Sequence, residues 1–410
     1  MTDADPATGR DAASDAPRLW RAVSALGVAQ IISWGTLFYT IAVLGASMRA
    51  DTHASEIVLF GAFTAGLFLS GLASPWIGRR IDSHGGRGVL ASGSVLGALA
   101  MAILGTAQEP VAMVAGWLVA GIAMAACLYD PAFVTLHQIA GSSYRRAVTA
   151  LTLYGGFAST VFWPLSQYLL ETTGWRNAFY LYAILHLTIC LPIHLACVPP
   201  FRRPARHAES ATTTTASSHP RGGATFAWLA SAFALATFIS SALAAHLIEM
   251  LTATGLTARD AVMIGTLVGP MQVAGRIMEF AFARHLRALA VGTLAFTLMA
   301  IAVLVFTQVR GIWIVAIAFV IPYGWSNGVM TIVRGTVPAE LFGQRDYGAL
   351  LGRLAQPQFI AKAFAPLAMT LVFAVDSTRA ISVYALCGVA IAALVAYQLA
   401  LRSRTRHRLH

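Results

Sequence analysis

Lys362 is the residue of this chain most suited to do chemistry inside a membrane. It is the only lysine among 28 Lys and Arg residues, and it lies in the middle of the apolar run Ala349–Val375. A charge at that depth is expensive, and its ammonium cannot easily reach water along its own side chain. We therefore predict that Lys362 binds a substrate or a coupling ion. The alternative is a structural ion pair with a buried carboxylate such as Asp130 or Glu279.

Arg276 and Glu279 are a second candidate for chemistry, in the apolar run Ala261–Ala283. They are one helical turn apart, so one interpretation is that they pair with each other. The other is that Arg276 joins Lys362 from a different helix. Two cations facing a water-filled cavity would prefer an anionic substrate, which favours a small carboxylate as the ligand.

The composition determines which elements must position these charges. Hydrophobic residues make up 57% of the chain and charged residues 11%, whereas soluble proteins carry about 25% charged residues. This predicts an all-α, multi-pass membrane protein. The net charge of +11 does not indicate nucleic acid, because the arginines recur in every second loop. The four cysteines lie in apolar runs, so no disulfide framework is expected.

Twelve apolar runs come close to the roughly 20 residues that a bilayer core requires. They predict a six-helix bundle over residues 20–198, a cytoplasmic linker over 199–224 and a second six-helix bundle over 225–401. A disordered tail over 1–19 and a basic tail over 402–410 complete the chain. The predicted spans are Trp20–Met48, Glu56–Ile77, Val89–Thr106, Val111–His137, Ala147–Leu170, Ala178–Val198, Thr225–Met250, Ala261–Ala283, Leu286–Phe306, Gly311–Val333, Ala349–Val375 and Ala380–Leu401.

The arginines also predict the orientation. If the N-terminal tail is cytoplasmic, 22 basic residues fall on the cytoplasmic side and 5 on the other side. Positive residues favour cytoplasmic loops. We therefore expect a protein of the plasma (inner) membrane with both termini in the cytoplasm. The linker is rich in Ser, Thr and Pro, and Pro164 and Pro366 occupy similar positions in the two halves. Two similar halves are typical of secondary transporters.

A basic turn between the second and third runs, GRRIDSHGGR, is the most specific motif. Gly78, Asp82, Gly85 and Arg87 match the Gly-x3-Asp-x2-Gly-x-Arg pattern of the major facilitator superfamily, which this chain resembles over residues 20–401. The resemblance implies two six-helix bundles around a central cavity that opens to each side in turn. Independently of it, Asp82 is able to cap a helix N-terminus or pair with arginines.

This chain shares features with one branch of that superfamily and lacks a feature of another. The Gly275-Arg276 pair and Lys362 resemble the oxalate–formate and monocarboxylate branch, in which cations on these helices bind a carboxylate. The drug antiporters usually carry an arginine where Trp117 stands. The resemblance therefore favours a transporter of a small organic anion, and an efflux permease for drugs, toxic amphipathic compounds or metalloids is the alternative.

Other polar residues are assigned roles by their depth. Asp130 is expected to form a gate latch with Arg145, Arg146 or Arg87, and His246 with Glu249 is either a proton relay or a hydrogen bond at the outer rim. The resemblance implies that helices 1, 10 and 11 line the cavity. It makes the following residues candidate substrate contacts: Gln30, Trp34, Tyr323, Trp325, Asn327 and Gln358.

Metals, nucleotides and enzymatic chemistry are not expected. His186, Cys190, His194 and Cys197 share a helical stripe that soft metals would favour, but Pro192 interrupts it and no metal site is predicted. No Gly-x4-Gly-Lys-Ser/Thr run is present, so ATP-driven transport is not predicted and no cofactor is expected. A membrane sensor would need a soluble output domain, and the sequence offers only short tails and one linker, so a sensor is not predicted. We expect a monomer with a small-molecule substrate and a possible coupling proton.

Overall fold

The computed structural model describes residues 7–201, 223–282, 285–343, 346–375 and 380–407. Within these ranges the secondary structure is helical throughout, joined by turns. The predicted all-α class is therefore confirmed. Most of the predicted linker lies outside the described residues, as do residues 1–6 and 408–410 of the predicted tails.

The first half of the chain runs from α1 to α10. Three of its long helices are interrupted or extended by short π or 3-10 segments. Its elements are α1 (Ala7–Trp34), η1 (Gly35–Tyr39), α2 (Ile41–Thr52), α3 (Glu56–His84), α4 (Gly86–Thr106), α5 (Pro110–Cys127), α6 (Tyr129–Ala140), η2 (Gly141–Ser143), α7 (Tyr144–Gly156), α8 (Ala158–Thr173), α9 (Trp175–Leu185), η3 (His186–Cys190) and α10 (Leu191–Cys197).

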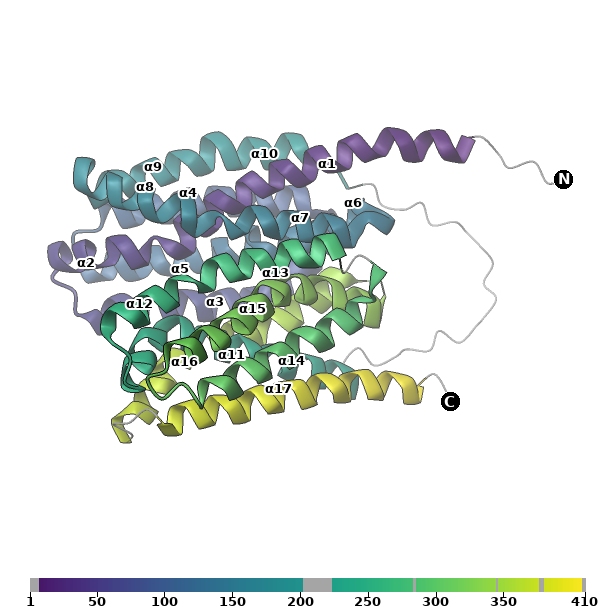
Figure 1. Ribbon diagram of the computed structural model, residues 1–410. Helices are drawn as coiled ribbons and strands as arrows, with labels where there is room; N and C mark the ends of the chain where they lie inside the picture. Colours follow the sequence, from purple (N-terminus) through teal and green to yellow (C-terminus); the bar gives the residue numbers. More distant parts are fainter. Residues whose placement is uncertain (1–6, 202–222, 283–284, 344–345, 376–379, 408–410) are drawn as a thin grey trace.

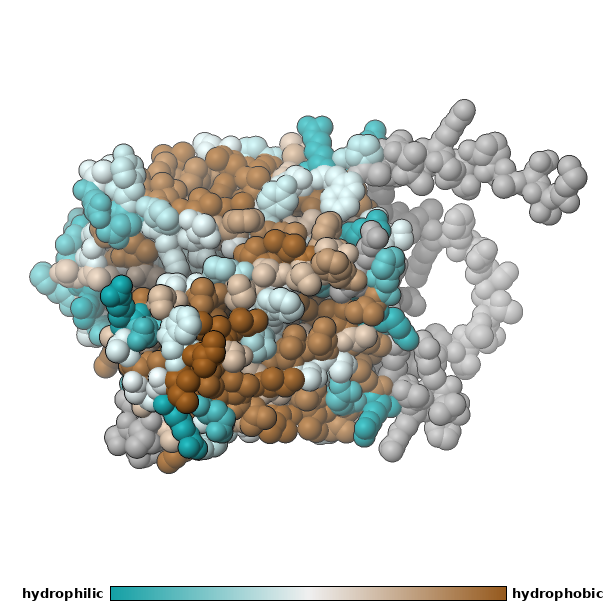
Figure 2. Space-filling model, in the orientation of Figure 1, coloured by the Kyte–Doolittle hydropathy of each residue, from teal (hydrophilic) through white to brown (hydrophobic). Residues whose placement is uncertain are grey.

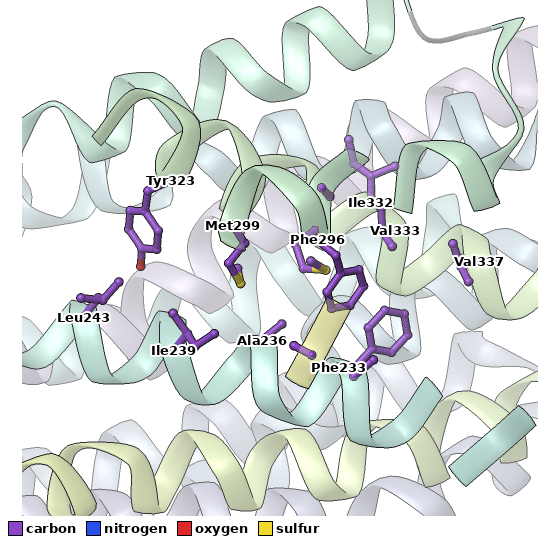
Figure 3. Packing of buried hydrophobic residues seen from close by; sticks show 14 of the residues in the cluster. Phe233, Ala236, Ile239, Leu243, Phe296, Met299, Tyr323, Ile332, Val333 and Val337 are labelled. Atoms are coloured by element: carbon purple, nitrogen blue, oxygen red, sulfur yellow. The ribbon is translucent and has the colours of Figure 1, made fainter. Parts of the chain in front are cut away.

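The second half of the chain begins at α11 and has longer uninterrupted helices. Its elements are α11 (Ala224–Ala253), α12 (Ala258–Thr266), α13 (Val268–Phe282), α14 (Ala288–Phe306), α15 (Trp313–Phe342), α16 (Tyr347–Val375) and α17 (Ala380–His407). Figure 3 shows the core of this half, where Phe233, Ile239 and Leu243 of α11 face Phe296 and Met299 of α14.

The helices are long and apolar enough for a multi-pass membrane protein. Ten stretches of the described chain could cross a bilayer by length and composition. One of them, Pro110–Thr173, contains two predicted spans, and the predicted span Ala349–Val375 is not among the ten. Figure 2 shows an apolar surface between two ends where hydrophilic residues gather.

The bundle has two distinct ends. We call the end that carries the turn between α3 and α4 the latch end, and the opposite end the far end. The first residues of α1 and the last residues of α17 both lie at the latch end (Figure 1). Helix α1 begins at Ala7 and α17 ends at His407, so residues 7–19 of the predicted disordered tail and residues 402–407 of the predicted basic tail are helical. Alanines in the first segment favour helix over coil.

The far end of the first half is fixed by one charged cluster. Asp51 accepts hydrogen bonds from Trp175 Nε1 at 2.8 Å and Arg176 Nη1 at 2.7 Å. These hydrogen bonds, the one from Trp175 foremost, lower the pKa of the Asp51 carboxyl below its ordinary value. The Asp51 carboxylate therefore keeps its charge to a lower pH than an ordinary aspartate does.

Glycines let helices cross closely inside the first half. A Cβ added to Gly66 on α3 would collide with the carbonyl oxygen of Trp117 on α5, and one on Gly121 would collide with the carbonyl oxygen of Gly66. Such contacts between small residues stabilise helix pairs in a membrane, where the hydrophobic effect between helices is weak.

The two halves meet through a few helices. Helix α3 packs along α16, α7 packs on α13 and α15, and α6 packs on α16. These contacts position the side chains of the candidate site.

Gly66→Val should lower the free energy of unfolding by about 1–3 kcal/mol, because the added methyl groups over-pack the α3–α5 crossing. Gly61→Val, on the same helix, is the matched control, since nothing lies within 4 Å of a Cβ at that position. Thermal unfolding of the purified protein in detergent measures both. Equal midpoints for the two variants would contradict the proposed close contact.

Candidate functional site

Lys362 lies on α16 at a point where the helix lacks one backbone hydrogen bond. Pro366 has no N–H to give to the Lys362 carbonyl four residues earlier. Ser241 Oγ of α11 donates to that carbonyl at 2.8 Å instead. The polar contact therefore stabilises α16 just where it presents the lysine.

The Lys362 ammonium rests on aromatic rings of the first half. Its Nζ is 3.7 Å from the centroid of Phe38 and 5.1 Å from that of Trp34, within cation–π range. No hydrogen bond or ion pair of this ammonium is found among the described residues. Phe38 belongs to the π-helical turn η1, a distortion frequent at functional sites. The lysine thus bridges the two halves without a carboxylate partner.

Further rings continue this aromatic surface. Trp34 lies 5.1 Å from Tyr129 and 6.2 Å from Tyr39, and Tyr39 lies 6.0 Å from Trp163, all measured between ring centroids. Of these residues only Trp34 was predicted from the sequence. The others were missed because aromatic residues in apolar runs carry no signal that separates a cavity wall from a lipid-facing surface.

Arg276 on α13 is only 6% exposed, and its guanidinium donates hydrogen bonds to backbone carbonyls. Its Nε donates to Gly328 O at 3.3 Å, and its Nη1 donates to Thr152 O at 3.1 Å. Thr152 belongs to α7 in the other half. Gly156, one turn further along α7, has no side chain where a Cβ would collide with Nη1. In this conformation Arg276 therefore connects the halves.

Glu279 does not pair with Arg276, the first of the two interpretations of their spacing. Its carboxylate accepts hydrogen bonds from Arg145 Nε at 2.9 Å, from Arg145 Nη2 at 2.6 Å and from Thr149 Oγ1 at 2.9 Å. Both partners lie on α7. Arg276 is within reach of Glu279 along the helix. Arg145 on the facing helix competes successfully, because its planar guanidinium donates two hydrogen bonds to the Glu279 carboxylate.

Asp130 also pairs across the halves, with a partner that we did not predict. Arg334 Nη2 of α15 approaches its Oδ1 at 3.5 Å. The predicted latch with Arg145, Arg146 or Arg87 is wrong in its partner, because Arg145 is bonded to Glu279. Arg334 was counted among the loop arginines, yet it lies inside α15. The Lys362 charge acts on Asp130 from farther away.

The glycine motif closes the latch end. Asp82 accepts a hydrogen bond from Gly348 N at 2.8 Å and another from Ala349 N at 2.7 Å. It therefore caps the N-terminus of α16, where backbone N–H groups lack partners and the helix dipole favours an anion. Gly78 and Gly348 allow this approach, because a Cβ on either would collide with the other's carbonyl oxygen.

Gly85 serves the same turn in another way. It ends α3 with φ of +82°, a conformation that favours glycine, and a Cβ there would also meet Phe201. No ion pair of Arg87 or Arg146 is found in the described part of the chain.

A tyrosine pair adds a second contact at the latch end. Tyr144 OH of α7 donates to Gly335 O of α15 at 2.7 Å and lies 3.1 Å from Tyr347 OH of α16. His137 of α6 stacks on the Tyr347 ring with centroids 4.1 Å apart. These contacts, with the Asp82 cap and the two ion pairs, hold the halves together at this end.

Several predicted substrate contacts have structural partners instead. Gln30 is fully buried, and its Nε2 donates at 2.8 Å to Cys127 O, the carbonyl that Pro131 leaves unpaired. Tyr323 points into the core of the second half near Leu243 (Figure 3). Gln358 is 3% exposed and donates to Leu354 O of its own helix.

Two other predicted contacts lie on α15. Asn327 Oδ1 accepts a hydrogen bond from Ser240 Oγ of α11 at 3.0 Å. Trp325 is partly buried, its Nε1 has no partner among the described residues, and its backbone packs against Gly275. Neither is in contact with Lys362 in any described interaction.

His246 and Glu249 form a contact at the far end of α11. His246 Nδ1 is 3.5 Å from Glu249 Oε2, and its Nε2 is 3.1 Å from Pro366 O of α16. This arrangement fits a rim hydrogen bond, with Phe373 packed on the ring. It brings the pair near neither Asp130 nor Arg276 in the described contacts.

The stripe lies on η3 and α10 of the first half, where His186, Cys190 and His194 are buried and Cys197 is half-buried. His186 Nε2 is 2.8 Å from Thr36 Oγ1, and His194 Nδ1 is 2.8 Å from Ser94 Oγ. The π-helical segment η3 alters the spacing between the histidines. Among the described residues no group of three or more His, Cys, Asp or Glu side chains is placed to hold a metal ion.

Comparison with known proteins reveals one family and one fold. Residues 26–321 match the family model described as Major Facilitator Superfamily. The human organic anion transporter MFSD10 (TETRAN) has a similar fold, with a TM-score of 0.72 over 93% of this chain and 99% of that one, at 16% identity. Among curated protein sequences no relative is found.

Asp82→Asn should loosen the latch end, because an amide offers one acceptor oxygen to two N–H groups and no charge to the helix dipole. The reporter is Ser74→Cys, a position 4% exposed on α3 that lies against Gly352 of α16. Its alkylation by a water-soluble maleimide should accelerate roughly 5- to 150-fold.

Asp51→Asn at the far end makes the same chemical change away from the latch and is the matched control. It should leave the alkylation rate unchanged. Equal rates in the Asp82 variant and the parent would show that the cap does not hold the end closed.

Proposed function

The chain belongs to the major facilitator superfamily, and on that premise we propose that it is a secondary active transporter of a small organic anion. A multi-pass membrane protein of this family has a small-molecule substrate and is not an enzyme. The anion, a carboxylate in our proposal, binds at Lys362. One observation carries this: Lys362 lies between the halves with aromatic contacts and no carboxylate partner among the described residues.

The electrostatics around Lys362 support an anionic ligand. Tyr129 lies within electrostatic range of both Arg276 and Arg334, and Lys362 lies within range of Arg334 and Asp130. The region around Lys362 and Tyr129 therefore holds three cations, Lys362, Arg276 and Arg334. Among the described residues it holds one carboxylate, that of Asp130, which pairs with Arg334. Such an excess of positive charge raises the local concentration of anions. Glu279 does not reduce this excess, because Arg145 neutralises it.

Alternating access is the proposed mechanism. The halves are held together at the latch end by the Asp82 cap and the pairs Arg145–Glu279 and Asp130–Arg334. Release of these contacts would open Lys362 to that side. Arg276 is part of the same event, since separation of α7 from α13 frees the donor it gives to Thr152 O. We propose that the freed guanidinium then contributes to anion binding beside Lys362.

The finer architecture is also part of the proposal. Twelve crossings in two six-helix bundles agree with the positions of the α1 and α17 ends at one side (Figure 1), which requires an even number of crossings. We propose that this side is cytoplasmic, in the plasma (inner) membrane, and that the monomer is the working unit. His246 with Glu249 is the pair that we propose as the carrier of a coupling proton.

The alternative is efflux of drugs, toxic amphipathic compounds or metalloids. The half-buried aromatic rings around Trp34 favour it, because amphipathic compounds bind such surfaces. Lys362 distinguishes the two functions: an anion carrier depends on it, whereas a carrier of neutral or cationic compounds is impeded by a positive charge at the centre.

Lys362→Ala should weaken carboxylate binding roughly 10- to 150-fold, the worth of a charge-assisted hydrogen bond, and abolish uptake into proteoliposomes. Lys362→Arg should also fail, because a planar fork does not occupy the position of a compact ammonium. Arg276→Gln should reduce affinity less than the Lys362 variants do. Arg353→Ala is the control cation on the same helix and should bind normally. Normal transport by Lys362→Ala would refute the anion site.

The orientation is testable with single cysteines. Ser83 lies exposed in the last turn of α3, at the latch end, and Glu109 lies exposed at the far end before α5. In intact cells an impermeant thiol reagent should label Glu109→Cys and spare Ser83→Cys, with both labelled after permeabilisation. Cys197, the native cysteine that is not fully buried, is replaced by serine in both variants. The reverse pattern would invert the proposed topology.

A further inference from the structure

The walls around Lys362 carry information about the ligand beyond its charge. This inference rests on the proposed carboxylate site and concerns the rest of the ligand. Phe38 and Trp34 lie against the ammonium, and Tyr129 and Tyr39 extend from Trp34 with centroid distances of 5.1 and 6.2 Å. A ligand that meets Lys362 therefore meets ring faces and edges at the same time.

The rings also lead to an open groove. A groove of about 600 Å³ lies between α2 and α8, and Trp163 is part of its wall. Trp163 contacts Tyr39 edge to face, with centroids 6.0 Å apart and planes 85° apart. Tyr39 in turn contacts Phe38 at 5.3 Å. An unbroken series of aromatic contacts thus joins the groove to the ring under Lys362.

The charges around the site favour a ligand with one anionic group. Lys362 is the central cation without a hydrogen-bonded partner among the described residues. Arg276 bonds the carbonyls of Gly328 and Thr152, and Arg334 approaches Asp130. While the latch end is closed, a second carboxylate on a small ligand would have to displace one of those contacts. A cationic ligand is disfavoured because the ammonium already occupies the position over the rings.

One buried donor completes the description. Trp34 Nε1 is buried and has no hydrogen-bond partner in the described part of the chain. Buried donors are nearly always satisfied in native structures. Its ring is the one that Lys362 approaches at 5.1 Å, so a carboxylate bound to Lys362 would bring an acceptor close to this indole.

We propose that the ligand is an aryl monocarboxylate. Its carboxylate pairs with the Lys362 ammonium, and its ring packs among Trp34, Phe38 and Tyr39 by edge-to-face or offset stacking. Such ring pairs are favourable beyond the area they bury. The small dicarboxylates are then poor ligands, since a second negative group would face an aromatic wall.

The test compares three probes on purified full-length protein by calorimetry: phenylacetate, cyclohexylacetate and succinate. Cyclohexylacetate matches phenylacetate in size and charge and is the more hydrophobic, so burial of apolar surface alone would favour it. We expect phenylacetate to bind roughly 2- to 12-fold more tightly than cyclohexylacetate, the worth of one ring pair. Succinate should bind more weakly than both.

Variants assign that preference to the rings. Phe38→Leu should remove most of the preference for phenylacetate, whereas Phe38→Tyr should keep it. Phe60→Leu on α3 is the matched control, because Phe60 is 48% exposed and is not among the rings around Lys362. This variant should keep the preference as well. Thermal unfolding of each variant shows whether it is folded. If Phe38→Leu does not fold, Phe38→Tyr still tests the ring, because loss of the preference in that variant would contradict the assignment.

The outcomes separate this inference from the proposed function. If the wild type binds carboxylates through Lys362 but favours cyclohexylacetate or succinate, the aryl ligand is refuted and the anion site stands. If phenylacetate binds equally well to Lys362→Ala, both are refuted. A preference for phenylacetate that survives Phe38→Leu, or one that is lost in Phe60→Leu, would also overturn the assignment of the ring.

Discussion

The Asp82 cap is the interaction on which the arrangement of the two halves depends. One carboxylate of the first half accepts hydrogen bonds from two backbone N–H groups in the first turn of α16, those of Gly348 and Ala349. Those groups would otherwise be unpaired at a helix end that packs against α3. The cap is possible only because Gly78 and Gly348 bring the backbones together. Since α16 also carries Lys362, the same contact fixes where the lysine meets the first half.

Some of the remaining charges hold the halves together, and in our proposal Lys362 binds a ligand. Glu279 and Asp130 neutralise Arg145 and Arg334 across the interface. Each pair costs desolvation, which good geometry offsets. Lys362 has rings in place of a carboxylate, and a cation–π contact compensates only part of the lost hydration. In our proposal this difference makes the surroundings of Lys362 attractive to an anion.

Prolines explain why several polar residues are where they are. Pro131 leaves Cys127 O without its helical donor, and Gln30 supplies one. Pro366 does the same to Lys362 O, and Ser241 supplies the donor. A buried carbonyl without a partner is costly in a membrane. Gln30 and Ser241 therefore serve the backbone of a neighbouring helix.

The sequence by itself determined the class of the protein. The length and apolarity of its runs, the turn motif at Gly78–Arg87 and the depth of Lys362 are properties of local sequence. They were enough to predict an all-α membrane transporter of this superfamily, which the family match confirms. These features need no knowledge of which helix faces which.

Only the tertiary structure decided the partners. Arg276 and Glu279 are one turn apart, yet each bonds to α7, because the planar fork of Arg145 and the bare backbone at Gly156 face them there. Arg334 looked like a loop arginine until α15 was seen to extend past it. Phe38 became a candidate ligand contact only when α16 brought Lys362 against it, and Tyr39 because its ring adjoins that of Phe38. A residue's partner across helices depends on crossing angles and rotation about each axis, which local sequence does not encode.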